Sequence, residues 1–145
     1  MADKQCTPPA PCLLAALLCD QVIREMVTGK PTLVGVFEHV AAVDFPAVHP
    51  RMTFFFQLTN GHGKTPILIK LVDVENDDTV VIEHTMDVEF RDVRDTVSAE
   101  FTISPLIIPH EGEYRFQLYA RTEFLGERRF ICRKIQMLPG GTRHE

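Results

Sequence analysis

Six histidines are the side chains of this sequence best suited to bind a metal or to move a proton. They are His39, His49, His62, His84, His110 and His144. No two of them have the His-x-His or His-Glu-x-x-His spacing that seeds a metal site. A metal-dependent enzyme would have to gather His84, His49 or His62 from distant strands, and we rank it third among three candidate functions. The sequence predicts no catalytic residue, no metal ligand and no cofactor.

His84 is the most informative of the six, because it falls on the apolar side of an alternating segment over Thr79–Phe90. The residues that share its face are Val80, Ile82, Met86, Val88 and Phe90. A period of two predicts a strand with this face toward the core. We therefore interpret His84 as a hydrogen-bonded core histidine or one at the rim of the core. A role as ligand or base is the alternative.

An acidic run at residues 73–78 separates two predicted strands. It reads Asp-Val-Glu-Asn-Asp-Asp, and clustered carboxylates suit a hard cation such as calcium. However, only one loop is so equipped, and Asp and Asn are common turn formers. The favoured interpretation is a hairpin turn, and a small-ligand or cation site here is the alternative.

Nucleophilic catalysis finds little support. The chain lacks Gly-x-Ser-x-Gly, and its two serines are Ser98 and Ser104. Cys19 and Cys132 lie in apolar runs and are interpreted as structural. Residues 61–65, Gly-His-Gly-Lys-Thr, resemble the end of a phosphate loop but lack its leading glycine at the required spacing.

The net charge of the chain limits the classes of binding partner that can be expected. The net charge is −5 and the sequence pI about 5.7, which argues against nucleic acid or an anionic membrane. Between Asp73 and Glu100, ten carboxylates oppose two arginines, which predicts a solvated acidic face. Four arginines predict an outward basic face of a C-terminal hairpin: Arg115, Arg121, Arg129 and Arg133. Pairing with acidic neighbours is favoured there over binding of phosphate or an acidic partner.

The four cysteines form no Cys-x-x-Cys pair, which is typical of a protein in a reducing compartment. The apolar run Leu13–Cys19 has seven residues and is not followed by a signal-peptide cleavage site. We expect a cytoplasmic protein that does not enter the membrane.

Alternation dominates the rest of the chain and predicts an all-β fold. The clearest strands are Met52–Thr59, Thr79–Phe90, Val97–Ile103 and the two arms of a hairpin over Gly112–Ile135. About eight strands separated by turn signals indicate a two-sheet antiparallel β-sandwich, immunoglobulin-like or C2-like. We expect a flexible Pro-rich leader at residues 1–12, one domain at 13–137 and a flexible tail at 138–145.

The segment 13–24 is ambiguous between helix and strand. Its Leu and Ala content favours a helix, whereas the strand character of the residues after Gly29 favours a pair of strands around that glycine. We prefer the strand pair. Asp20 would be costly on a buried face, so it should mark a sheet edge or a capped turn.

Four segments together resemble a family of uncharacterised bacterial proteins, a domain of unknown function. They are Leu17–Asp20, Leu33–Phe37, Phe45–Pro50 and Gly112–Phe116. The similarity covers roughly Leu13–Ile135. It implies a small standalone β-sandwich and brings no activity, cofactor or catalytic residue.

The function therefore stays unknown from the sequence, with three hypotheses. The first is a non-catalytic interaction or structural module that docks a protein partner or a second copy through an edge strand or an exposed region around Phe55. The second is a sandwich that binds a small ligand or cation at residues 73–78. The third is the histidine-based metal enzyme.

Overall fold

The computed structural model describes residues 9–136, and this part of the chain is all-β, as predicted. Most of the predicted leader and all of the predicted tail lie outside the described residues. The strands are β1 (Cys12–Cys19), β2 (Gln21–Arg24), β3 (Pro31–Val34), β4 (His39–Ala42), β5 (Ala47–His49), β6 (Met52–Thr59), β7 (Gly63–Asp73), β8 (Thr79–Phe90), β9 (Thr96–Ile103), β10 (Leu106–Ile108), β11 (Gly112–Ala120) and β12 (Glu123–Lys134). A short 3-10 helix, η1 (Val74–Asn76), joins β7 to β8.

The predicted count of about eight strands is wrong, because residues 9–136 contain twelve. Strands β4, β5 and β10 have only three or four residues, too few for an alternation to show in the sequence. No helix in the described part of the chain is long and apolar enough to cross a membrane.

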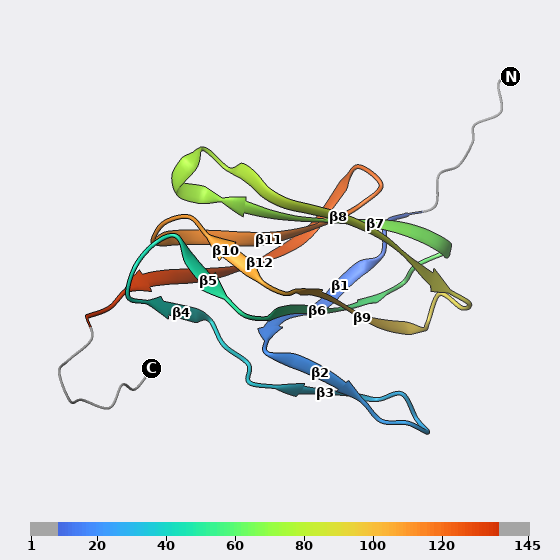
Figure 1. The fold of residues 1–145 in the computed structure, drawn as a ribbon. Helices are drawn as coiled ribbons and strands as arrows, with labels where there is room; N and C mark the ends of the chain where they lie inside the picture. Colours follow the sequence, from blue (N-terminus) through green and yellow to red (C-terminus); the bar gives the residue numbers. More distant parts are fainter. Residues whose placement is uncertain (1–8, 137–145) are drawn as a thin grey trace, which may run out of the picture.

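The strands form two larger sheets and two ribbons. One sheet has the order β4-β12-β11-β7-β8, the other has the order β1-β6-β9, and the ribbons are β2-β3 and β5-β10. Figure 1 shows the five-stranded sheet above the three-stranded one, with the β2–β3 ribbon below both. Neighbours are antiparallel except β12 and β4, which run parallel.

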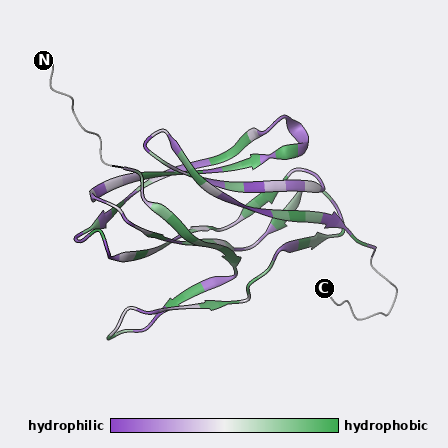
Figure 2. Ribbon diagram, turned by 180° about the vertical axis from the view of Figure 1, so that it is seen from behind, coloured by the Kyte–Doolittle hydropathy of each residue, from purple (hydrophilic) through white to green (hydrophobic). Residues whose placement is uncertain are grey.

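The core lies between the two larger sheets and follows from the alternation in β6 and β11. Phe54 of β6 stacks on Phe116 of β11 with ring centroids 4.8 Å apart, and both side chains are fully buried. Phe130 of β12 contacts Phe116 with ring centroids 6.1 Å apart and stacks on Tyr114 at 5.3 Å. Figure 2 shows the same pattern as alternating hydrophobic and hydrophilic bands along the strands. Burial of each such ring stabilises the fold by about 1.5–3 kcal/mol.

The preferred strand pair around Gly29 is confirmed. Strands β2 and β3 pair in register, and Gly29 has a φ of +72° in the turn between them. That left-handed backbone is open to glycine and strained for other residues.

The β2–β3 ribbon lies over the outer face of the three-stranded sheet. The Arg24 guanidinium donates to the carbonyl O of Ser98 at 3.0 Å and to the carboxylate of Glu100 at 2.6 Å, both on β9. Thr53 Oγ1 of β6 donates to the carbonyl O of Asp20 at 3.3 Å. Phe55 is on this outer face and is only 4% exposed. The prediction of an exposed docking region around Phe55 is therefore wrong, because the ribbon forms a further layer over that face.

Candidate binding site

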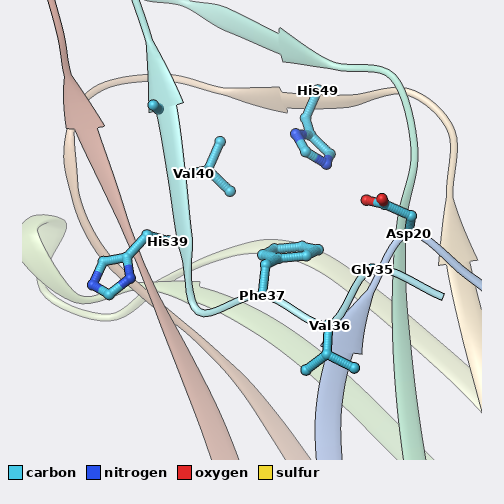
Figure 3. Close-up of a pocket in the computed structure, with 8 residues that line it drawn as sticks. Asp20, Gly35, Val36, Phe37, His39, Val40 and His49 are labelled. Atoms are coloured by element: carbon cyan, nitrogen blue, oxygen red, sulfur yellow. The ribbon is translucent and has the colours of Figure 1, made fainter. Parts of the chain in front are cut away.

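A pocket of about 270 Å³ opens at the base of the β2–β3 ribbon. Its walls come from the turn after β1, the segment after β3, the start of β4 and the end of β5. The lining residues are Asp20, Gly35, Val36, Phe37, His39, Val40, Ala41 and His49 (Figure 3).

Backbone hydrogen bonds hold the first two walls together. The N–H of Asp20 donates to the carbonyl O of Val34 at 2.9 Å, and the N–H of Phe37 donates to the carbonyl O of Leu18 at 3.0 Å. The chain leaving β3 is thereby bound to the end of β1. Asp20 lies in the turn between β1 and β2 and is exposed, as predicted for a residue at a sheet edge or turn.

Gly35 makes room for the Asp20 carboxylate. Its φ is +70°, and a Cβ added there would lie 2.3 Å from Asp20 Oδ2. Such a distance is far inside van der Waals contact. Only glycine therefore permits both this backbone conformation and the approach of the carboxylate.

Three different side chains meet in the pocket. The rings of Phe37 and His49 are tilted by 45° with centroids 5.7 Å apart. The Nε2 atom of His49 is buried and has no hydrogen-bond partner among the described residues. In Figure 3 the Asp20 carboxylate points toward the space beside these two rings, whereas His39 points away. An unpaired buried nitrogen costs about 1–3 kcal/mol, which a ligand that hydrogen-bonds to it would recover.

A second polar cluster lies at the far end of β7 and holds a loop in place. Asp73 is 2% exposed, and its Oδ2 lies 2.6 Å from Nε2 of His110. The Nδ1 of His110 lies 2.7 Å from the carbonyl O of Glu111. Because both ring nitrogens face acceptors, the arrangement favours the doubly protonated ring, and these two bonds, that of Glu111 first, raise the pKa of His110. His110 keeps no free nitrogen for catalysis as a base.

Tyr114 belongs to the same cluster. Its hydroxyl donates to the carbonyl O of His110 at 2.6 Å and accepts the N–H of His110 at 3.3 Å. Burial raises the pKa of Tyr114 to about 12. The tyrosine is therefore neutral at physiological pH, and the cluster ties the loop before β11 to the end of β7.

This cluster predicts a pH dependence of stability. The pKa of His110 is raised above its ordinary 6.5, so its pairing contributes fully below that pH and is lost as pH rises through the folded-state pKa. We expect the free energy of unfolding to fall by about 0.5–1 kcal/mol across this range, a small change because a side chain 41% exposed is screened by water. Urea denaturation from acidic to alkaline pH measures it. His110→Gln should remove this component, and an unchanged pH profile in that variant would contradict the assignment.

The acidic run at 73–78 forms a turn. It contains η1 and joins the antiparallel partners β7 and β8, as the hairpin interpretation predicts. Asp77 and Asp78 have φ of 52° and 56°, and Asp73 turns inward to His110. Within residues 9–136, no three His, Cys, Asp or Glu side chains gather as metal ligands.

The other predicted candidates lie apart from the pocket. His84 is exposed, and its ring stacks on Phe101 of β9 with centroids 4.4 Å apart. It lies at the rim, where edge strands β8 and β9 of the two sheets meet, and the structure gives it no hydrogen bond. His62 is exposed in the turn between β6 and β7. His49 is the one of the three proposed enzyme histidines that lines the pocket.

The predicted pairing with acidic neighbours is confirmed for Arg115, whereas Arg121, Arg129 and Arg133 make no ion pair within residues 9–136. The cysteine interpretation agrees with the burial of both thiols. Arg115 pairs with Glu113 at 2.6 Å and with Glu127 at 3.0 Å, so acidic neighbours on the same hairpin occupy it. Cys19 and Cys132 are buried, and burial raises the pKa of both thiols, that of Cys132 to about 11. Neither thiol is suited to act as a nucleophile.

The pocket itself was missed by residue-type reasoning, although a signal for it was present. Three of the segments that carry the family resemblance supply Asp20, Gly35 with Phe37, and His49. Comparison with family models agrees with that resemblance: the model of a family of unknown function, DUF6941, matches residues 14–133. No curated protein matches the chain.

Proposed function

Since the chain belongs to the DUF6941 family, whose function is unknown, we propose a function from its geometry: it is a non-catalytic protein-interaction module. We propose further that its two larger sheets are the layers of a β-sandwich, which is supported by the aromatic stack between them. The docking element of this module is the tip of the β2–β3 ribbon.

The observation that carries the proposal is the exposure of two aliphatic side chains at this tip. Met26 is 95% exposed and Val27 is 89% exposed, more than the other large hydrophobic residues of the described chain. They contribute nothing to the core. Covering them with an apolar surface of a partner would stabilise a complex by about 1.5–3 kcal/mol each.

The turn that presents them is held in one conformation. The Glu25 carboxylate accepts the N–H of Thr28 at 2.6 Å and the N–H of Val27 at 3.1 Å. These bonds, that of Thr28 first, hold the pKa of Glu25 below its usual value, so the turn keeps its charged acceptor. Arg24 ties the ribbon to β9. A preorganised apolar tip loses little entropy on binding.

The tip alone is too small for a stable interface, which buries about 1,200–2,000 Å². We therefore propose a partner protein that has an apolar cleft for the tip. The surface of this partner also contacts the rest of the β2–β3 ribbon. Strands β2 and β3, which lie between the tip and the pocket, have four residues each and are therefore about 13 Å long. One partner can span both.

We propose a cytoplasmic location in a bacterial cell. The support is that Cys19 and Cys132 are free thiols packed as small apolar side chains, an arrangement suited to a reducing compartment.

To test the proposal, a photoreactive amino acid replaces Thr28, next to the tip. Irradiation of the cells then crosslinks the protein to whatever contacts the tip. The crosslinked protein is identified, purified and titrated by calorimetry with the wild type and with Met26→Ser/Val27→Ser. We expect the double variant to bind at least tenfold more weakly, because each lost aliphatic contact exceeds the 1.4 kcal/mol that a factor of ten requires.

Val80→Ser/Val93→Ser is the control, since these valines are 45% and 42% exposed and belong to β8 and to the β8–β9 connection, not to the ribbon. It should change the affinity less than twofold. Equal weakening by both double variants, or no crosslinked protein beyond the unirradiated background, would overturn the proposal.

A further inference from the structure

We infer that the pocket at the base of the β2–β3 ribbon receives the cationic end of a lysine or arginine side chain of the partner protein. This inference rests on the proposed function, because it names the chemistry of that partner. It is carried by three groups that meet in the pocket and each attract a cation that donates N–H bonds.

The first group is the Asp20 carboxylate. It makes no hydrogen bond or ion pair with another residue of the described chain, so its charge is available to a ligand. The N–H of Asp20 is bonded to the end of β3, and the carboxylate lies beside Gly35 at the edge of the pocket. A carboxylate at this position favours a positive group and repels an anion.

The second group is the ring of Phe37, and the third is the imidazole of His49. The face of a phenylalanine ring attracts an ammonium or guanidinium group within about 6 Å of its centre. Nε2 of His49 has no hydrogen-bond partner among the described residues, and in the Nδ1–H tautomer of the ring its lone pair accepts an N–H. A cation with several N–H groups satisfies Asp20 and His49 together, whereas an apolar group would leave Nε2 unpaired.

The size of the pocket suits the end of a long side chain. Its volume of about 270 Å³ lies below the range of about 300–1,000 Å³ found for small-molecule sites. The end of a lysine or arginine enters such a space while its backbone stays on the ribbon surface.

The first experiment uses mimics of the side chain and needs no partner. Two mimics are titrated into 15N-labelled protein. One is Nα-acetyl-lysine N-methylamide, whose ε-amine is free, and the other is n-butylguanidinium. We expect saturable shifts of the amide signals of Asp20, Gly35 and Phe37, with millimolar affinity. Asp20→Asn should weaken this binding at least tenfold. Asp44→Asn removes an exposed aspartate that does not line the pocket and should leave binding unchanged.

Two results would overturn the inference. One is equal binding of n-butyramide, a neutral probe of similar size. The other is equal weakening by Asp20→Asn and Asp44→Asn. A free amine and a partner side chain share this chemistry, so free lysine is a separate arm: tighter binding of free lysine than of its capped form would assign the pocket to a small metabolite and contradict a protein side chain.

The second experiment separates this inference from the proposed function. Asp20→Asn should weaken the binding of the partner identified by crosslinking about tenfold. This loss should add to the loss caused by the tip variant. If the mimics do not bind while Met26→Ser/Val27→Ser still weakens the partner, the pocket inference fails and the interaction module stands. If the mimics bind while the tip variant leaves the partner's affinity unchanged, the docking proposal fails instead.

Discussion

Phe116→Ala is expected to lower the free energy of unfolding by about 3–5 kcal/mol, the usual range for a fully buried phenylalanine. Phe116 is 0% exposed. Its ring stacks on Phe54 at 4.8 Å and meets Phe130 at 6.1 Å, so its removal leaves a cavity between the two larger sheets. A domain is stable by about 5–15 kcal/mol, so the variant loses a large part of the total.

Urea denaturation followed by circular dichroism measures this loss. Phe124→Ala is the matched control, because Phe124 is 50% exposed on β12 and touches Tyr119 edge-on at 5.5 Å. We expect it to cost less than about 1 kcal/mol, the size of an exposed aromatic contact. Similar losses in both variants would show that the core does not lie between the two larger sheets.

Gly61→Ala is expected to cost about 2–3 kcal/mol, although it adds a single methyl group. A Cβ at Gly61 would lie 2.1 Å from Cδ2 and 2.2 Å from Cε2 of Phe90. Phe90 is 3% exposed and belongs to the core, so its ring can move only by disturbing its neighbours. Well-packed interiors resist such a shift.

Gly63→Ala is the control in the same turn. A Cβ there meets nothing within 4 Å, and the change only strains a φ of +68°, at about 1–2 kcal/mol. The cause of the larger effect can be isolated with Phe90→Leu. If the ring is responsible, Phe90→Leu costs less in the Gly61→Ala background than in the wild type, and additive losses would refute the overlap.

The alternation of single strands was readable from the sequence because it is local. Tyr114, Phe116 and Leu118 are spaced by two and all point into the core. The hairpin of β2 and β3 could be expected in the same way, from a glycine between two short apolar segments. The short ribbon β5–β10 could not, since its strands have three residues each and pair only after the chain has folded back.

The side-chain environment of single residues was harder to predict. The alternation places Phe55 on the outer face correctly, but its exposure depends on a ribbon that leaves β1 and returns over that face. His84 shares a face with core residues, yet its strand is an edge, so its ring is exposed beside Phe101. Period-two patterns report which face a residue takes and carry no information on what covers that face.

The sequence by itself determined that this chain is all-β and that Cys19 and Cys132 lie in apolar strand segments, where the structure buries them. These properties depend on neighbours along the strand and on composition. Only the tertiary structure decided where Asp20, Phe37 and His49 meet and that Asp73 pairs with His110. The physical reason is that these side chains come from separate strands and turns, and their distances are set by sheet order and register, which no local spacing encodes.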